Sequence, residues 1–336
     1  MRAFSCEVCA QRLFFENDLC LRCGTPQGFD PDRLELVARG DRRGCANALL
    51  AACNWLVADD DPIGLCVSCR LTRTRPNDGD AGALEQFAEA EQAKRRLVFE
   101  LLDTRLPIGA DLHFDLLSSR YEPVVTGHDH GVITLDLAES DDARREARRA
   151  QFDEPYRTLL GHFRHEIGHY YWPRLVEQAG ADELARARTL FGDERASYQD
   201  ALDRHYAQGP PDGWDERYVS AYATTHPSED WAESFSHYLH MRDTLQTAAE
   251  LGLTVGGAAI ADEPAPFPAL VGSWLRLAWA LNEVNRSMGR DDLYPFTLAD
   301  TVVAKLAYVE QRVAAAATAR TAAPVGESAD RGQLPQ

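Results

Sequence analysis

The sequence lacks the features that would indicate a membrane or secreted protein. No stretch of it approaches the roughly 20 consecutive apolar residues that a membrane-spanning helix needs. The first ten residues, MRAFSCEVCA, contain no basic segment followed by an apolar run, so they do not predict a signal peptide. No cysteine follows Cys69, which confines any disulfide or cysteine-based metal site to the N-terminal part of the chain.

Positive charge is scarce as well. The chain has 35 Lys and Arg against 53 Asp and Glu, a net charge of −18. Residues 1–75 contain ten Arg and ten acidic residues, so the whole deficit lies in residues 76–336. Phosphate contacts supply most of the affinity for nucleic acid, and we therefore expect no nucleic-acid partner for the acidic part. The neutral N-terminal part could still contact a protein or another anionic partner through Arg39, Arg42, Arg43, Arg70, Arg73 and Arg75.

Six of the eight cysteines occur in Cys-x2-Cys pairs, with two residues between the cysteines of each pair. Paired thiolates at this spacing bind one tetrahedral ion, and four of them form a closed structural zinc site. The order predicts one site from the first four cysteines and a second from the last four, with an interleaved arrangement as the alternative. The predicted ligands are Cys6, Cys9, Cys20 and Cys23 in the first site, and Cys45, Cys53, Cys66 and Cys69 in the second.

Disulfide bonds are the competing interpretation of these cysteines. They require an oxidising compartment, which the start of the sequence does not indicate. Reduced thiolates that bind zinc in the cytoplasm are the better account. A redox role for a Cys-x2-Cys pair would need a thioredoxin-like strand and helix around it, and the sequence pattern does not predict them.

A histidine-rich segment, residues 161–172, contains the pattern His-Glu-x-x-His. Positions four apart lie on the same face of a helix, so His165 and His169 can bind one metal ion. Glu166 follows the first imidazole and can take the proton of a water bound there. A helix that is rich in histidine by chance is the alternative. Three histidines within eight residues, with a Glu between them and an apolar stripe on the other side, disfavour it.

A third ligand is needed, because a catalytic zinc usually has three protein ligands and one open position. Residues 226–240 predict a helix in which Pro227 suits the first turn. Glu229 is the first candidate for the ligand, and Glu233 is then placed to orient a ligating imidazole. Glu233 is the second candidate and His237 the third. Alternatively, the acidic residues only favour the positive end of the helix.

Several long segments resemble a bacterial family of zinc-binding metallopeptidases with an N-terminal zinc ribbon. They are HFRHEIGHYYW, FGDERASY, HYAQGPP, VSAYATTHPSEDWAESFSHYLH and LNEVNRSMGRDDLYPF. The resemblance extends over roughly residues 4–312. It implies a ribbon domain followed by a zincin-like peptidase domain.

The segment Glu229-Asp-Trp-Ala-Glu233 also resembles gluzincins of the lethal-factor type. Their third ligand opens a Glu-aromatic-aromatic-Ala-Glu helix, and a tyrosine seven residues earlier faces the metal. The resemblance gives that role to Tyr222. Asp230 stands where the first aromatic residue would be, which leaves the choice between Glu229 and Glu233 open.

The order of predicted elements is typical of a mainly helical α+β fold. We expect a zinc-ribbon domain at residues 1–72, a polar linker at 73–82, a zincin-like domain with a small sheet at 83–317 and a disordered tail at 318–336. Within the second domain, periodicity predicts a helix over 83–102, then strands at 112–116, 123–126 and 132–137, and only helices and loops beyond 140.

The third of these strands alternates between apolar and polar residues, as a half-exposed strand does. We expect it to be an edge strand with which an extended substrate could pair. Residues 127–131 predict a tight connection before it. His128 and His130 in this connection are expected to cap a turn, with an accessory metal site as the alternative.

Together these patterns predict a cytoplasmic zinc-dependent peptidase with one catalytic and two structural zinc ions and a peptide or protein substrate. Glu166 would act as general base, and Tyr222 would help to hold the oxyanion. The competing class is a non-catalytic, zinc-stabilised adaptor in which the helix site is structural or empty. A fourth protein ligand there, such as His237 or Glu233, would favour the adaptor.

Overall fold

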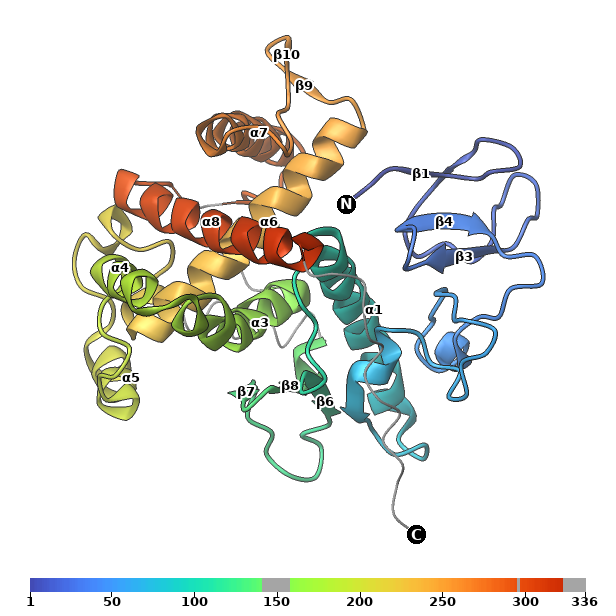
Figure 1. Cartoon of the computed structure of the whole chain (residues 1–336), viewed down its shortest axis with the longest axis horizontal. Coiled ribbons are helices and arrows are strands. Elements are labelled where there is room, and N and C mark those ends of the chain that lie inside the picture. The colour runs from blue at the N-terminus through green and yellow to red at the C-terminus, as the bar shows by residue number, and fades with distance from the viewer. Residues whose placement is uncertain (141–157, 295–296, 323–336) are drawn as a thin grey trace.

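The computed structural model describes residues 1–140, 158–294 and 297–322. The N-terminal region consists of short strands and turns (Figure 1). Long helices dominate the rest of the chain, which also contains a four-stranded sheet and a small hairpin. This is the mainly helical α+β fold with an N-terminal zinc ribbon that the sequence predicts. No helix within the described ranges is both long and apolar enough to cross a membrane.

The N-terminal region contains two antiparallel strand pairs. Strand β1 (Phe4–Ser5) pairs with β2 (Arg12–Leu13), and β3 (Gln27–Asp30) pairs with β4 (Glu35–Ala38). The 3-10 turns η1 (Ala46–Ala48) and η2 (Cys69–Leu71) follow. Strands of two to four residues are not stable alone, so this region depends on its cysteine sites and on a shared core.

The four-stranded sheet has the order β5-β6-β8-β7. Its strands are β5 (Thr72–Thr74), β6 (His113–Leu117), β7 (Gly127–Asp129) and β8 (Val132–Asp136). Strands β5, β6 and β8 are parallel, and β7 is antiparallel to β8. The expected strand at 132–137 is therefore not an edge strand, because β6 and β7 flank it. The edge strand next to β8 is β7, which lies where a tight connection was expected.

Three further expectations need correction. Residues 123–126 form no strand. The expected linker begins inside strand β5, which pairs with β6. Beyond residue 140 a small hairpin, β9 (Thr254–Val255) with β10 (Ala258–Ala259), adds strands to a part predicted to be helix and loop.

The helices agree better with the sequence pattern. The expected helix at 83–102 is α1 (Ala81–Asp103). The His-rich segment lies in α3 (Leu159–Leu175) and the acidic segment in α6 (Pro227–Glu250). The other elements are η3 (Leu137–Ser140), η4 (Glu177–Ala179), α4 (Ala181–Phe191), α5 (Tyr198–Gln208), η5 (Trp214–Glu216), η6 (Tyr222–Thr224), α7 (Phe267–Ser287) and α8 (Asp300–Ala322). Helix α8 includes residues 318–322 of the expected tail, and residues 323–336 lie outside the described residues.

Helices α3 and α6 pack closely against each other at Gly168. A Cβ added to Gly168 would lie 3.0 Å from the Cα of Ala232 on α6, which is tighter than ordinary packing. Trp231 of α6 donates its indole N–H to the carbonyl of Gly168 at 2.8 Å. The glycine in His-Glu-Ile-Gly-His therefore lets α6 approach the face of α3 that carries the histidines.

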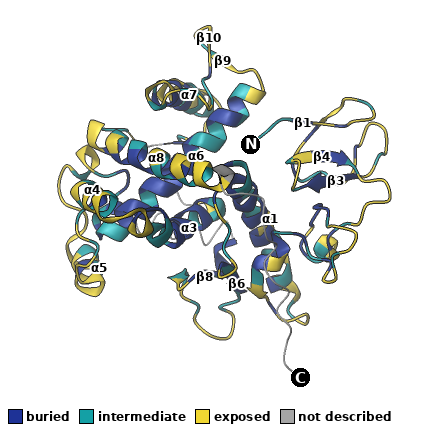
Figure 2. Ribbon diagram, viewed as in Figure 1, coloured by how far each residue is buried: buried dark blue, intermediate teal, exposed yellow. Residues whose placement is uncertain are grey.

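One apolar core runs through both regions (Figure 2). Phe99 of α1 is 1% exposed and packs among three aromatic rings of the N-terminal region. Its ring centroid lies 6.5 Å from that of Phe4, 5.4 Å from that of Phe15 and 5.8 Å from that of Phe29. The ribbon and the helical part thus bury apolar surface against each other.

Candidate metal centres

Helix α3 positions two imidazoles on one face. Thr158 caps the helix, with its hydroxyl accepting from the backbone N–H of Gly161 at 2.9 Å. His165 and His169 follow one turn apart, and their Nε2 atoms lie 3.2 Å from each other. Both nitrogens thus face the same point, as the spacing predicts.

Helix α6 brings a carboxylate to the same point. His226 caps this helix, accepting from the backbone N–H of Ser228 at 3.2 Å, and Pro227 occupies the first turn. Glu229 is 2% exposed. Its Oε2 lies 3.0 Å from Nε2 of His165 and 3.5 Å from Nε2 of His169.

The three atoms have the separations that a tetrahedral zinc site requires. Zinc bonds of about 2.0–2.2 Å place ligand atoms roughly 3.3 Å apart, and the three separations are 3.2, 3.0 and 3.5 Å. Oε2 of Glu229 is buried and has no well-oriented hydrogen bond within the described residues. A buried oxygen of this kind costs about 1–3 kcal/mol, and a cation inside the triangle would satisfy it. Within the described ranges no fourth potential ligand joins this group.

Glu233 lies behind His165 rather than in the triangle. Nδ1 of His165 donates to Oε1 of Glu233 at 2.6 Å, and the hydroxyl of Ser220 donates to Oε2 at 2.5 Å. Because Nδ1 carries the proton, the lone pair of Nε2 faces the triangle. Burial by itself raises the pKa of Glu233, but the hydrogen bond and charge of His165 lower it to about 2. Ser220 was not foreseen from the sequence.

The site is strongly polarised between its imidazoles and carboxylates. Burial favours neutral Glu229, yet the charges of the neighbouring His169 and His165 hold its pKa well below the usual range. Burial lowers the pKa of His165, but Glu229 and Glu233 together raise it well above 6.5.

The remaining imidazoles of α6 lie away from the triangle. His237 contacts the hydroxyl of Tyr294 through Nδ1 at 2.8 Å. His240 stacks on the same ring, with centroids 5.5 Å apart. Burial lowers the pKa of His237 to about 4 and that of His240 well below 6.5. Neither imidazole belongs to the metal triangle.

Two tyrosines and one glutamate border the triangle. Glu166 is 9% exposed and follows His165 on α3. Tyr222 opens η6, and its ring centroid lies 5.9 Å from that of His165. Tyr198 opens α5, and its ring meets that of His226 edge to face, with centroids 5.4 Å apart. Burial raises the pKa of Tyr198 to about 12. Tyr198 lies in the segment FGDERASY, but no spacing pattern singles it out.

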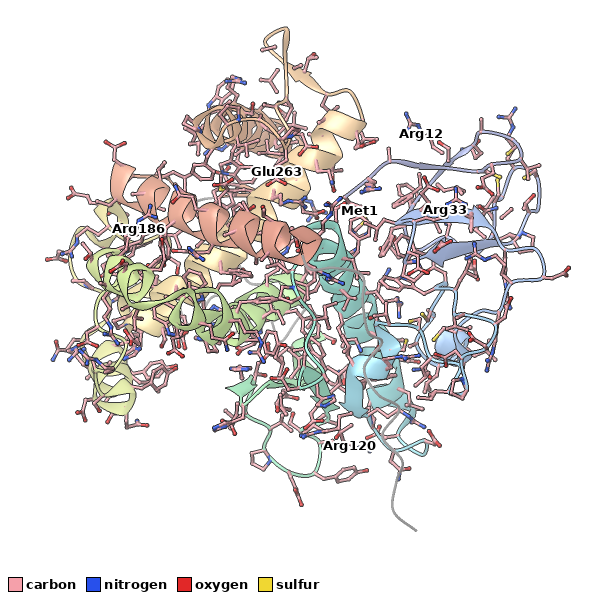
Figure 3. All side chains as sticks on the ribbon, viewed as in Figure 1. Met1, Arg12, Arg33, Arg120, Arg186 and Glu263 are labelled. Carbon is pink, nitrogen blue, oxygen red and sulfur yellow. The ribbon has the colours of Figure 1, made fainter. Side chains whose placement is uncertain are left out.

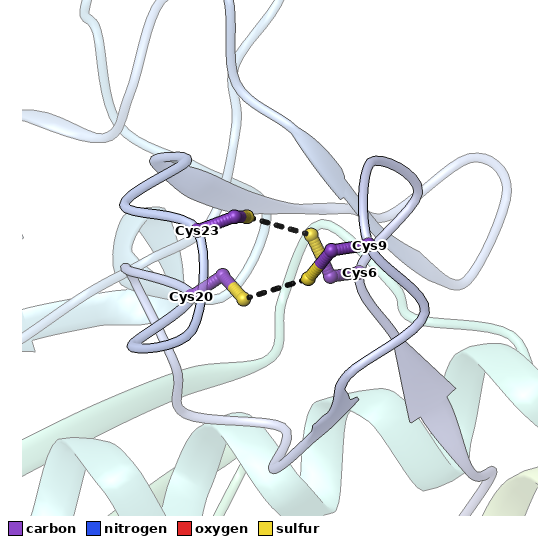
Figure 4. A group of neighbouring side chains, drawn as sticks. All are labelled: Cys6, Cys9, Cys20 and Cys23. Atoms are coloured by element: carbon purple, nitrogen blue, oxygen red, sulfur yellow. Dashed lines mark hydrogen bonds between the residues drawn. The ribbon is translucent and has the colours of Figure 1, made fainter.

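The thiols of the first four cysteines form one group (Figure 4). The Sγ atoms of Cys6 and Cys23 lie 3.7 Å apart, and those of Cys9 and Cys20 lie 3.6 Å apart. Zinc–sulfur bonds of about 2.3 Å predict separations of roughly 3.8 Å, so this group fits a zinc ion. Figure 3 shows all side chains on the ribbon, with yellow sulfur atoms in the N-terminal region that carries the labels Arg12 and Arg33.

The last four cysteines form a second, fully buried group, so the two groups are not interleaved. Sγ of Cys53 lies 3.7 Å from Sγ of Cys66, and the backbone N–H of Cys66 points to Sγ of Cys45 at 3.4 Å. Sγ of Cys69 lies 3.7 Å from a carboxylate oxygen of Glu91 on α1. The second group therefore borders the helical part directly.

The six arginines that the sequence suggested for an anionic partner already have contacts within this chain. Each of the six contacts an oxygen of this chain: Arg39 with the carbonyl of Arg42, Arg42 with Asp30, Arg43 with the carbonyl of Asp61, Arg70 with Asp61, Arg73 with Asp115 and Arg75 with Asp78. These contacts leave less charge for an anionic partner than the sequence suggests.

The connection beside the sheet edge holds no third metal group within the described residues. Nε2 of His128 accepts from the backbone N–H of Gly131 at 3.1 Å, which caps the turn. His130 is exposed and contacts Asp129. The ring of His128 also lies against Tyr170 of α3, with centroids 6.1 Å apart. This contact places β7 beside the metal-site helix.

Comparison with known proteins relates the chain to two families. Residues 83–312 match the family described as "Putative zinc-binding metallo-peptidase", and residues 3–80 match a zinc-ribbon domain family. Proteins described as uncharacterized from Mycobacterium bovis and from two strains of Mycobacterium tuberculosis are each 54% identical over 322 residues, which covers 92% of this chain and 94% of theirs. No solved structure matches the chain.

Proposed function

This chain belongs to the family of zinc-binding metallo-peptidases, and we propose that it is a zinc-dependent peptidase that hydrolyses peptide bonds. The observation that carries the proposal is the triangle of His165, His169 and Glu229, with ligand atoms 3.0–3.5 Å apart. Three protein ligands leave one position open, which is typical of catalytic rather than structural zinc. The two thiol groups are proposed to hold two structural zinc ions.

Zinc in such a site acts as a Lewis acid and supplies hydroxide at neutral pH, because it lowers the pKa of a bound water to about 7. Glu166 follows His165 on the same helix and is proposed to take the proton of the attacking water. It would then pass this proton to the leaving amine. Tyr222, beside His165, is proposed to donate to the oxyanion. Glu233 accepts the Nδ1 proton of His165 and so favours the tautomer in which the Nε2 lone pair is free to bind the metal.

The substrate is proposed to be an extended peptide that pairs with β7. This strand is the last of its sheet, so its backbone groups on one side have no partner strand within the described residues. It also packs beside α3, which carries His165 and Glu166. A peptide added along β7 would therefore pass the metal triangle.

The eight thiols are free of disulfides, and we propose a reducing compartment, the cytoplasm.

The direct test replaces the proposed base. Glu166→Gln should keep zinc in the His/Glu site, since Glu166 is not a ligand, and should lower peptide hydrolysis by roughly two to four powers of ten. Metal content by elemental analysis and turnover of an unfolded protein substrate are both measured. His130→Gln, at an exposed position outside the triangle, serves as the control. An active Glu166→Gln protein would refute the mechanism, and an inactive wild type with zinc in place would favour the adaptor.

A further inference from the structure

One histidine of the His-rich segment has no part in the metal triangle. His162 lies on α3 three residues before His165 and four before Glu166, so it belongs to the same side of the helix. Its side chain is half-buried, and its Nδ1 contacts Oε2 of Glu139, a residue of η3 that is 4% exposed. A carboxylate buried to this degree is costly unless it has partners. The contact ties the metal-site helix to η3.

Glu139 connects His162 to the edge strand of the sheet. Its Oε1 accepts from the hydroxyl of Thr126 at 2.8 Å, and Thr126 directly precedes β7. The same hydroxyl oxygen accepts from the backbone N–H of Asp136, the last residue of β8, at 3.0 Å. Thr126, Glu139 and His162 thus form a clamp that fastens the start of β7 to the end of β8 and to α3.

A second contact holds β7 to α3 further along the helix (Figure 1). The rings of His128 on β7 and Tyr170 on α3 meet edge to face, with centroids 6.1 Å apart. His162 and Tyr170 are separated by about 12 Å of helix, and the whole His-Glu-Ile-Gly-His stretch lies between them. Strand β7 is therefore fixed to α3 on both sides of the metal-binding stretch.

We propose that His162 is a positioning residue for the substrate. Through Glu139 and Thr126 it sets the distance between β7, the proposed peptide-binding edge, and the metal triangle. The strand dictates where the carbonyl groups of a paired peptide lie, so one carbonyl reaches the metal only if this distance is kept. His128 fixes one end of β7 and the clamp fixes the other. The inference rests on the proposed function for the peptide, whereas the clamp itself can be tested without one.

Hydrogen exchange tests the clamp in the zinc-loaded protein without substrate. His162→Ala should speed exchange of the backbone amides of residues 127–136 about tenfold, as expected when a local restraint is lost. Thr126→Val, which removes the hydroxyl at the other end of the clamp, should do the same. His162→Gln keeps a donor for Glu139 and should restore the slow exchange. Gln178→Ala, at an exposed position beyond the end of α3, is the control and should leave exchange unchanged.

Zinc affinity of the His/Glu site, measured by chelator competition, separates positioning from support of the helix. His162 is not a ligand, so His162→Ala should leave this affinity unchanged. A fall in zinc affinity would show that His162 maintains α3 itself and would overturn the inference.

Peptide binding tests the positioning. In a Glu166→Gln background, which should hold zinc without cleaving, an extended peptide long enough to pair along β7 should bind about tenfold more weakly after His162→Ala. A dipeptide, too short to pair along the strand, should bind equally to both proteins, and His162→Gln should rescue the long peptide.

The outcomes distinguish the inference from the proposed function. Unchanged exchange in His162→Ala, or faster exchange with undiminished binding of the long peptide, would overturn the inference and leave the proposed function standing. Faster exchange in a zinc-loaded protein that neither binds nor hydrolyses peptides would refute the proposed function and support the clamp. Faster exchange together with weaker binding of the long peptide alone would support both.

Discussion

Replacing Phe99 by Ala should destabilise the ribbon and the helical part together. Phe99 belongs to α1, yet its ring packs among Phe4, Phe15 and Phe29 of the N-terminal region. The sequence predicts two domains separated by a linker, from which independent unfolding would follow. A shared aromatic core predicts one cooperative transition instead.

The magnitude follows from burial. Phe99 is 1% exposed, and truncation of a buried Phe to Ala costs about 3–5 kcal/mol through lost transfer energy and the cavity left behind. That is a large share of the roughly 5–15 kcal/mol by which folded proteins are stable. We therefore expect the unfolding midpoint to fall by roughly 4–7 °C.

Two probes report the two regions separately in the same thermal unfolding experiment. Far-UV circular dichroism follows the helices, and a chromophoric chelator follows zinc release from the cysteine sites. Both midpoints should fall together in Phe99→Ala. Phe14→Ala truncates a side chain of the same region that is 80% exposed, and it should shift neither midpoint by more than a degree or two. Early zinc release with an unchanged helical transition would refute the shared core and restore two independent domains.

Three other predictions concern the metal sites and pH. Glu229→Ala should abolish metal binding at the His/Glu site, whereas Glu233→Gln should weaken it by about 10–100-fold; the reverse order in chelator competition would make Glu233 the ligand. Elemental analysis should find three zinc ions per chain and two after His165 and His169 are both changed to Ala; two in both proteins would remove the catalytic site. Burial holds the pKa of His240 well below 6.5 in the folded chain. The neutral His240 side chain therefore contributes to the stability of the fold above pH 6.5, and this contribution is lost as the pH falls, because the unfolded chain binds the proton more readily. The free energy of urea unfolding should therefore decrease less from pH 7 to pH 5 in His240→Gln than in wild type, and equal decreases would contradict the assignment.

The candidate site was most predictable where its geometry is local. His165 and His169 are one helical turn apart, so their convergence follows from the helix alone. The first four cysteines fall into knuckles whose spacing already limits the pairing. Glu229 could only be ranked first among three candidates on the helix predicted at residues 226–240, because no local rule relates α6 to α3. The close contact at Gly168 supplies that relation, and it is tertiary.

What could not be predicted depends on pairing between distant segments. The alternation in residues 132–137 shows that β8 is a strand but not which strands flank it, so β7 was missed as the edge. Residues 72–74 are polar and short, and only their parallel pairing with β6 makes them a strand. Ser220 lies outside α3 and α6, and packing alone brings its hydroxyl to Glu233.

Asp230, the departure from the gluzincin pattern, has a structural explanation that leaves the metal ligands in place. Its Oδ2 lies 2.6 Å from Nζ of Lys305 on α8, and both side chains are buried. Lys305 also donates to the carbonyl of Arg217 at 2.7 Å and lies 4.3 Å from the ring centroid of Tyr218.

This ion pair therefore holds the segment that leads to Ser220 and Tyr222. Burial raises the pKa of Asp230 to about 7 although Lys305 opposes the shift, and an aromatic residue at position 230 would leave a buried lysine without its carboxylate, at a cost of several kcal/mol. The acid at 230 thus faces α8 while Glu229 faces α3. The change in pattern alters how the loop before α6 is anchored, and it leaves Glu229, not Glu233, beside Nε2 of both histidines.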